Sequence, residues 1–204
     1  MSSRDVLVEE DDLVPDFARG YVVGQKKTVD EYVKLDDNDE SLRKWKESLG
    51  LTSATRGSIG APGDKRKVVI LRLQLEIQDH EAITVDLDNP NALEKLRTTP
   101  IVLKEGSLYK VSTRFRIQHE IITGLRYLQV VKRKGIRLDK SNEMCGSYTP
   151  NTLDKPYYDK TFLEEEAPSG MLARGSYDIV SSFVDDDNNV HLSFTWVLNI
   201  KKSW

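Results

Sequence analysis

Two runs near the C-terminus, in which apolar and polar residues alternate, constrain the fold most strongly. In the second run the even-numbered positions from Leu192 to Ile200 carry large apolar side chains. Successive side chains of a strand point to opposite faces, so this strand would have one apolar face. The three acidic residues Asp185 to Asp187 separate the two runs and predict a hairpin turn. Because a large apolar face must be covered, the pattern predicts a sheet packed against a second layer.

The same period of two recurs through most of the chain after residue 65. Turn-forming pairs, such as Asn89-Pro90, Thr123-Gly124 and Lys134-Gly135, separate the runs. Short strands at this spacing are typical of an antiparallel sandwich or barrel. The predicted strands lie near 68–77, 82–87, 100–103, 107–118, 124–133, 177–184 and 190–201.

The first 65 residues follow a different pattern and predict an N-terminal arm. Residues 1 to about 25 mix acidic with scattered apolar residues without a period, which is typical of a disordered tail. Capping-box spacings from Thr28 to Glu31 and from Asp37 to Glu40 predict two short helices, a helical hairpin over about 28–50. A linker at 51–65 then leads to one β-domain at 66–204.

Composition excludes several classes of protein. A net charge of −3 gives no electrostatic reason to bind nucleic acid. The single cysteine, Cys145, allows no disulfide within the chain and fits a reducing compartment. No apolar run approaches 18 residues, and the N-terminus lacks a secretion signal. We therefore expect a cytoplasmic protein with no lipid of its own and no stable membrane insertion.

Residues that could catalyse a reaction or bind a metal form no motif. The three histidines stand alone, and no nucleophile elbow or phosphate loop is present. The stretch Asp185–Asn189 resembles the start of a calcium loop, but Val190 stands where that loop needs glycine. We expect no enzyme, no cofactor and no metal. The hairpin acids are then either a solvated turn or a contact for a partner.

Two charged clusters have a structural and a functional interpretation. The basic run at 132–137 is typical of an edge strand protected against aggregation, and the alternative, a weak attraction to anionic lipid, would need more charge. The acidic run at 164–166 is either a solvated loop or a dock for a basic peptide. The larger apolar positions on the predicted strands favour an ordinary core over a ligand pocket on pattern alone.

The stretch from Gly170 to Tyr177, Gly-Met-Leu-Ala-Arg-Gly-Ser-Tyr, resembles the signature of the Rho GDP-dissociation inhibitors. Residues 35–49, 102–106, 133–140 and 144–148 resemble other stretches of that family. The resemblance extends over about residues 28–204 in one order.

The resemblance implies a binding protein with an immunoglobulin-like β-sandwich and a flexible, partly helical N-terminal arm. Such proteins bind prenylated Rho-family GTPases in the GDP state and block nucleotide release. They shelter the geranylgeranyl lipid between the two sheets and so extract the GTPase from membranes. A monomer, or a heterodimer with the GTPase, is expected. The alternative is a general carrier of prenylated proteins without switch-region control; an adhesion domain is disfavoured by the lack of paired cysteines.

The resemblance also assigns roles to single residues. The arm acid Asp39 would contact the switch I side of the GTPase, and the hairpin acid Asp187 the switch II side. Ile101 and Phe194 differ from the Phe and Trp of other members, and Trp45 replaces a tyrosine. The implied GTPase-binding residues are Tyr32, Asp39, Ser41, Trp45, Asp186 and Asp187. The implied prenyl-binding residues are Leu73, Leu75, Ile101, Tyr109, Ile121, Ile179, Phe194 and Trp196, and the residues implied to bind the basic tail are Glu164, Glu165 and Glu166.

Overall fold

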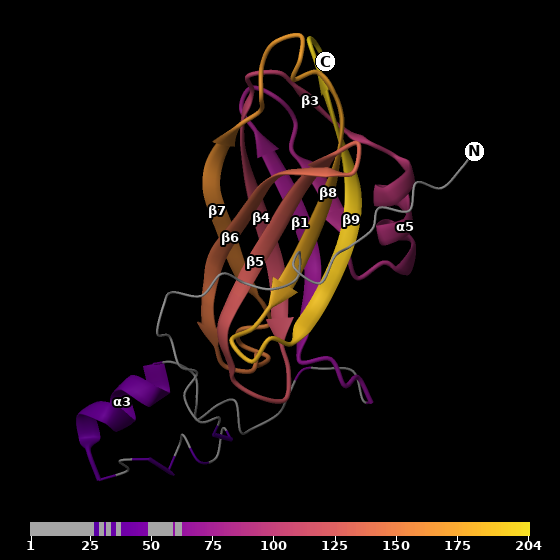
Figure 1. Ribbon diagram of the computed structural model, residues 1–204. Coiled ribbons are helices and arrows are strands. Elements are labelled where there is room, and N and C mark those ends of the chain that lie inside the picture. The colour runs from indigo at the N-terminus through magenta and orange to yellow at the C-terminus, as the bar shows by residue number, and fades with distance from the viewer. Residues whose placement is uncertain (1–26, 29–30, 32–33, 36–37, 49–58, 60–62) are drawn as a thin grey trace.

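Two β-sheets packed face to face make up most of the computed structural model (Figure 1). The structure describes residues 27–28, 31, 34–35, 38–48, 59 and 63–204. Its elements are α3 (Glu40–Ser48), β1 (Val68–Ile77), β2 (Ile83–Asp86), α5 (Pro90–Thr98), β3 (Ile101–Lys104), β4 (Leu108–Ile117), β5 (Ile122–Arg133), β6 (Ile136–Tyr148), β7 (Tyr158–Glu166), β8 (Gly175–Val184) and β9 (Val190–Lys201).

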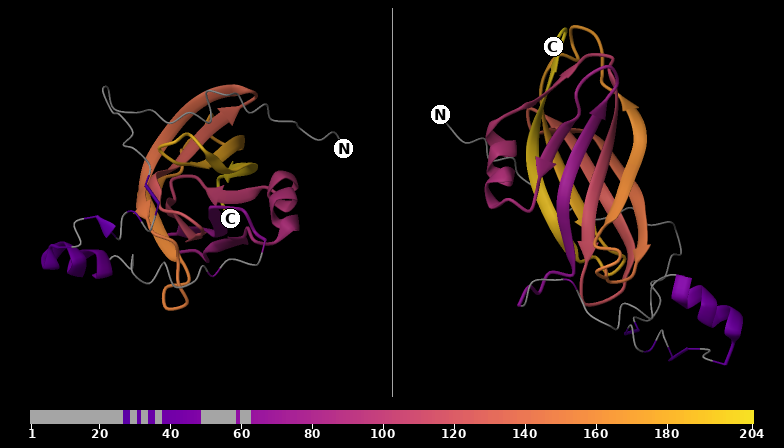
Figure 2. Two further views of the ribbon diagram at one scale, coloured as in Figure 1. Left: turned by 90° about the horizontal axis from the view of Figure 1, so that it is seen from below. Right: turned by 180° about the vertical axis from the view of Figure 1, so that it is seen from behind.

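The four-stranded sheet has the order β2-β1-β4-β7, and the five-stranded sheet has the order β3-β9-β8-β5-β6. Figure 2 shows the two sheets enclosing one interior, with α5 along one side. This arrangement confirms the predicted all-β sandwich. The prediction of an antiparallel fold is wrong at one place, because β3 runs parallel to β9 with Ile101 beside Leu198. The helix α5 lies between β2 and β3 in the chain, where the chain passes from the four-stranded to the five-stranded sheet.

The alternation read from the sequence determines which side chains meet in the interior. In β9 the even-numbered residues from Phe194 to Ile200 are buried, and in β1 Leu73 and Leu75 face them from the other sheet. Burying these apolar surfaces supplies the main favourable free energy of folding, at about 25 cal/mol per Å².

Three elements were missed by the sequence pattern. The strands β6 and β7 are the outermost strands of their sheets, so both of their faces carry polar or exposed residues and show little alternation. The pair Asn89-Pro90, predicted as a turn, begins helix α5 instead. The Asn89 Oδ1 atom accepts a hydrogen bond from Asn91 N at 3.0 Å, and proline occupies the first turn.

The helical signals of the arm are partly confirmed. Thr28 and Glu31 form the predicted capping box: Thr28 N donates to Glu31 Oε2 at 2.7 Å, and Glu31 N donates to Thr28 Oγ1 at 3.2 Å. Asp39 caps α3, because its Oδ1 atom accepts from Ser41 N at 2.8 Å, and Asp37, where the second predicted spacing begins, lies outside the described residues. The predicted helix stop at Gly50 and most of the linker lie outside the described residues.

Candidate functional site

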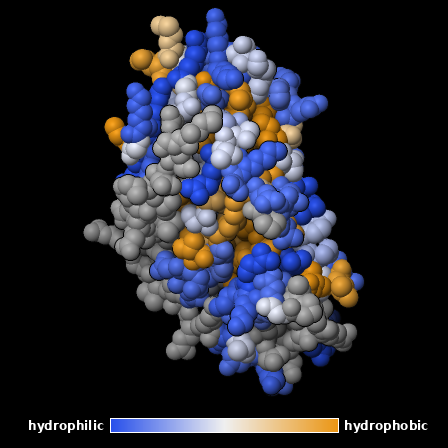
Figure 3. Space-filling view, turned by 90° about the vertical axis from the view of Figure 1, so that its right-hand side faces the viewer, coloured by the Kyte–Doolittle hydropathy of each residue, from blue (hydrophilic) through white to orange (hydrophobic). Residues whose placement is uncertain are grey.

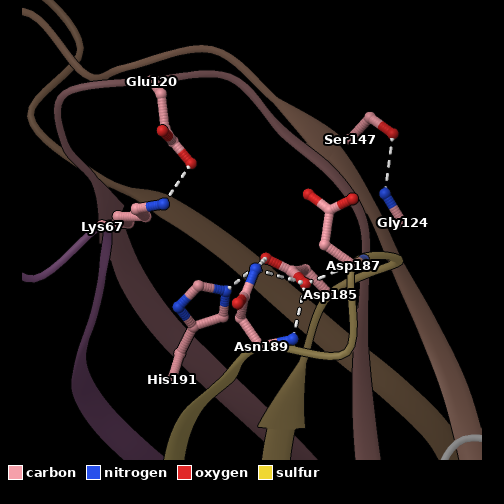
Figure 4. A network of polar contacts seen from close by, with 8 residues as sticks. All are labelled: Lys67, Glu120, Gly124, Ser147, Asp185, Asp187, Asn189 and His191. Atoms are coloured by element: carbon pink, nitrogen blue, oxygen red, sulfur yellow. Dashed lines mark hydrogen bonds and ion pairs between the residues drawn. The ribbon is translucent and has the colours of Figure 1, made fainter. Parts of the chain in front are cut away.

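The hairpin between β8 and β9 carries the three aspartates, and the structure gives each a different environment (Figure 4). Asp185 is buried, and its Oδ1 atom accepts hydrogen bonds from Asp187 N at 3.0 Å and Asn189 N at 2.9 Å. His191 Nε2 lies 2.9 Å from Asp185 Oδ2. Burial alone would raise the pKa of Asp185, but the hydrogen bonds from His191 and Asn189 lower it to about 2. Asp185 is therefore an ionised structural centre of the turn.

Asp186 is also buried, with 5% of its surface exposed. Its backbone N–H donates to Thr123 O at 3.1 Å, and its carboxylate lies 3.8 Å from Arg126 Nε. The carboxylate fills the space beside Gly124, where an added Cβ would lie 2.0 Å from it. Gly124 has a φ of +58°, which a residue without a side chain adopts at little cost. This packing fastens the hairpin to the start of β5.

Only Asp187 of the three acids is exposed. Its carboxylate points away from the cluster formed by Asp185, Asn189 and His191 (Figure 4). A turn held this firmly by its neighbours presents the exposed acid in a fixed position, which lowers the entropy lost on binding a partner. The carboxylate of Asp187, unlike that of Asp186, is therefore accessible to a binding partner.

Most of the residues implied to bind a prenyl group lie in the interior between the sheets. Ile179 and Trp196 are neighbours in the register of β8 and β9. Tyr109 is half-buried, and Ile121 is half-buried in the turn between β4 and β5. The residues of this set that belong to the buried core are Leu73, Leu75, Ile101, Ile179, Phe194 and Trp196.

A cavity of about 400 Å³ lies at the side of the sandwich that α5 covers, not at its centre. Of the implied prenyl-binding residues, Ile101 is the one that lines it. The remaining apolar lining includes Ile83 and Val85 of β2 and Ala92 and Leu96 of α5. Figure 3 views the side on which α5 lies in Figure 1 and shows hydrophobic residues gathered along its middle. At this edge β2 and β3 belong to different sheets, so no sheet hydrogen bonds close the interior between them.

A chain of polar groups runs through the apolar interior. Trp196 Nε1 donates to Ser181 Oγ at 3.0 Å, and Tyr127 Oη lies 2.9 Å from the same oxygen. Tyr127 Oη also donates to Gln129 Oε1 at 3.0 Å. Burial raises the pKa of Tyr127 well above its usual range, so the phenol stays neutral. These hydrogen bonds fix the orientation of the Trp196 ring against the core.

The three glutamates at the end of β7 are engaged to different degrees. Glu164 Oε2 lies 3.2 Å from Lys110 Nζ on the neighbouring strand. Glu165 accepts a hydrogen bond from the Tyr109 hydroxyl, which links an implied prenyl-binding residue to an implied tail-binding one. Burial and the nearby Glu165 carboxylate raise the pKa of Tyr109 above its usual range. Glu166 is exposed at the end of the strand.

Comparison with known proteins identifies the family. A family profile described as "RHO protein GDP dissociation inhibitor" matches residues 8–203. The chain belongs to this family.

Curated members of the Rho GDP-dissociation inhibitor family match the chain over most of its length. The Rho GDP-dissociation inhibitor of Saccharomyces cerevisiae is 51% identical over 183 residues, covering 89% of this chain and 90% of that protein. The inhibitor of Schizosaccharomyces pombe is 44% identical, with coverages of 89% and 86%. Rho GDP-dissociation inhibitor 1 of Homo sapiens is 41% identical, with coverages of 88% and 84%. The predicted family is therefore confirmed.

The stretch that resembles the signature of the Rho GDP-dissociation inhibitors, residues 170–177, forms the loop before β8 and the first residues of that strand. Arg174 donates to both carboxylate oxygens of Glu105, at 2.8 and 2.7 Å, and Gly170 N donates to Glu105 Oε2 at 3.0 Å. These hydrogen bonds lower the pKa of Glu105 to about 2. Arg133 donates to Leu172 O and to Arg174 O at 2.8 Å, tying the loop to the β5–β6 hairpin. Arg133 in the basic run thus organises this loop and is not only a solvated edge residue.

The arm positions of this family member are described only in part. Asp39 and Ser41 lie at the start of α3, where Ser41 is exposed and Asp39 is both exposed and the helix cap. Tyr32 and the side chain of Trp45 lie outside the described residues.

The part of the site built by α5 was not predicted from the sequence. The signal for it was present in the sequence: Asn89-Pro90 is followed by two apolar residues three apart, Leu93 and Leu96, and this pattern is typical of a helix start.

Within the described part of the chain, no group of three or more His, Cys, Asp or Glu residues could hold a metal ion. No helix in that part is long and apolar enough to span a membrane.

Proposed function

We propose that this protein is a Rho GDP-dissociation inhibitor that binds prenylated Rho-family GTPases in the GDP state, blocks nucleotide release and extracts them from membranes. The family membership and the relatives named Rho GDP-dissociation inhibitor support the general activity. In this proposal residues 1–65 act as the regulatory arm and residues 66–204 as the prenyl-binding domain, and the inhibitor acts in the cytoplasm without any enzymatic step.

The cavity beside Ile101 is the observation that carries the lipid-binding part of the proposal. Its volume of about 400 Å³ lies within the range of about 300–1,000 Å³ typical of small-molecule sites. It adjoins the core at the edge where β2 and β3 are not hydrogen-bonded to each other. We infer that the geranylgeranyl tail enters here and extends inward along Ile179 and Trp196. Entry at this edge separates side chains without breaking a sheet.

The energetics explain why a pocket alone is not enough. Burying a chain of about 20 carbons, at about 0.8 kcal/mol per CH₂, is worth on the order of 10–15 kcal/mol relative to water. A membrane offers nearly the same burial, so the transfer from lipid to pocket is close to neutral. The free energy of extraction must therefore come from contacts with the GTPase itself.

The exposed acids of the arm and the hairpin are suited to supply these contacts. Asp39 begins helix α3, and Asp187 is held on a turn that the buried Asp185 organises. A charge-assisted hydrogen bond contributes roughly 1.5–3 kcal/mol. Contacts of the arm with the switch segments would also hold them still, and nucleotide release needs those segments to open. The acids Glu164, Glu165 and Glu166 would face the basic tail that precedes the lipid.

A variant that fills the cavity tests the proposal. Ala92 on α5 lines the cavity and is half-buried, so Ala92→Trp places an indole in it without enlarging a core residue. Ala82→Trp, at an exposed position just before β2, is the matched control. Liposomes carrying a prenylated Rho GTPase with GDP are mixed with each variant, and the GTPase released into the supernatant is measured.

We expect Ala92→Trp to lose extraction at least tenfold and Ala82→Trp to extract normally. Normal extraction by a folded Ala92→Trp variant would show that the lipid lies elsewhere. The alternative function, a general carrier of prenylated proteins, predicts that nucleotide release from the GTPase is not slowed. Measuring GDP release in the same samples separates the two functions.

A further inference from the structure

The outer face of the five-stranded sheet carries an apolar strip that is buried although it faces away from the core. The side chains of Tyr127, Ile179 and Phe183 point inward, so their neighbours along β5 and β8 point outward. Among these outward residues Leu128 is 0% exposed, and Val130 and Val180 are 1% exposed. We call the following residues the outer strip: Leu128, Val130, Lys132, Val180 and Ser182.

The side chains paired directly with Leu128 and Val180 across the sheet are too short to bury these two residues. Leu128 lies between Asn142 on β6 and Ser182 on β8, and Val180 lies between Val130 and Thr195. A leucine in the middle of an uncovered sheet face keeps its outward methyl groups in water. Among the elements that the structure describes, no helix or strand lies over this face (Figure 1). A further layer of protein must therefore cover the outer strip.

Charge indicates what kind of segment this layer is. Three cations border the outer strip or lie in it: Lys132 is 3% exposed, the side chain of Arg126 is 13% exposed, and Lys140 is half-buried beside Val130. All three make polar or electrostatic interactions. A buried ammonium group is tolerated only beside anionic or carbonyl oxygens. The covering segment should thus combine apolar side chains with carboxylates.

The segment before Lys27 has this composition. Its 26 residues include six acidic and three basic residues, together with the apolar stretches Val6–Val8, Leu13–Val14 and Tyr21–Val23. An extended chain of this length spans up to about 90 Å, which is ample to cross a sheet. The linker before Gly63 fits poorly, since its one charged residue is the cation Arg56.

We propose that the N-terminal segment, residues 1–26, packs across the outer strip of its own chain, with its apolar side chains on Leu128, Val130 and Val180 and its carboxylates toward Arg126, Lys132 and Lys140. The segment then shields an apolar sheet face that would otherwise favour association. This packing also attaches the start of the arm to the outer face of the five-stranded sheet. This inference does not rest on the proposed function, because it involves neither a GTPase nor a lipid.

Paramagnetic relaxation enhancement in the full chain tests the proposal. A nitroxide maleimide is attached to Ala18→Cys, which lies between the apolar stretches. The native Cys145 is buried, and burial raises its pKa to about 12, so it does not compete for the label. We expect the methyl signals of Leu128, Val130 and Val180 to lose at least half of their intensity. The methyl signals of Leu163, exposed on the other sheet, should be unchanged.

Two further measurements separate the alternatives. Lys140→Glu should restore the methyl intensities, whereas Lys110→Glu, at a half-buried lysine on the other sheet, should not. Mixing spin-labelled chains with isotope-labelled chains that lack the nitroxide reports contacts between molecules. Unbroadened signals of the outer strip, equal effects of the two lysine variants, or broadening only in the mixed sample would each overturn the proposal.

Discussion

Replacing Asp39 at the start of α3 separates two roles that one carboxylate can have. Its Oδ1 atom accepts hydrogen bonds from Ser41 N at 2.8 Å and Leu42 N at 3.2 Å, so it caps the helix. The same exposed carboxylate is proposed to contact the GTPase. Asp39→Ala removes both the cap and the charge. Asp39→Asn keeps a side-chain oxygen that caps about as well and removes only the charge.

The two variants should differ in how much GTPase affinity they lose. Loss of the cap costs about 1 kcal/mol of helix stability, and loss of a charge-assisted contact costs roughly 1.5–3 kcal/mol. If Asp39 contacts the GTPase, Asp39→Asn should weaken binding by about tenfold or more, since 1.4 kcal/mol is a factor of ten. Asp39→Ala should weaken it by a further factor of about five. If Asp39 is only a cap, Asp39→Asn should bind like the wild type.

The assay is a fluorescence titration of prenylated GTPase–GDP with each variant. Glu40→Gln is the matched control, because it removes one negative charge from the same helix turn, where Glu40 pairs with Lys44 at 2.9 Å on an exposed surface. It corrects for the interaction of an acid with the helix dipole, worth about 0.3–1 kcal/mol. Equal affinities of Asp39→Asn and Glu40→Gln would refute the contact assigned to Asp39.

Two predictions concern the hairpin that presents Asp187. The pKa of Asp185 is lowered to about 2 in the folded protein, below its usual 3.8, so its contribution to stability is present above about pH 4 and is lost as the pH falls toward 2. Between pH 4.5 and 2.5 the wild type should lose about 1.5 kcal/mol of stability through Asp185, and urea unfolding should show that Asp185→Asn lacks this loss; an unchanged pH dependence would contradict the ionised turn. Gly124→Ala should destabilise the protein by about 1–3 kcal/mol or more, because Gly124 has a positive φ and the new Cβ meets the Asp186 carboxylate. Adding Asp186→Ala should recover the part due to the clash, and thermal unfolding of the single and double variants measures it.

Alternation predicted the sandwich because strands in the middle of a sheet have one face in the core. The runs of β1, β8 and β9 show it clearly, and their inward residues are the ones that the pattern marks. The same rule fails for β6 and β7, which lie at the edges of their sheets. A sequence with polar residues on both faces of a strand is not distinguishable from a loop by periodicity.

The resemblance named residues for the candidate site but not how they are arranged in space. The resemblance marked Asp186 and Asp187 alike, yet only Asp187 is exposed. The difference arises because Gly124, more than 60 positions earlier in the chain, leaves room for the Asp186 carboxylate. Likewise Ile101 lines the cavity and Ile179 does not, because residues of β2, α5 and β3 enclose it at the open edge of the sandwich.

The amino-acid sequence alone was therefore enough to predict which faces of the central strands are apolar, where the hairpin turns lie and which family the chain belongs to. These features depend on local periodicity and on motifs that are contiguous in the chain. Which acids reach the surface, where the cavity lies and what the outer strip must be covered by depend on contacts between segments distant in sequence. Such contacts arise only when the two sheets and α5 come together, because burial and electrostatic environment are properties of the packed structure.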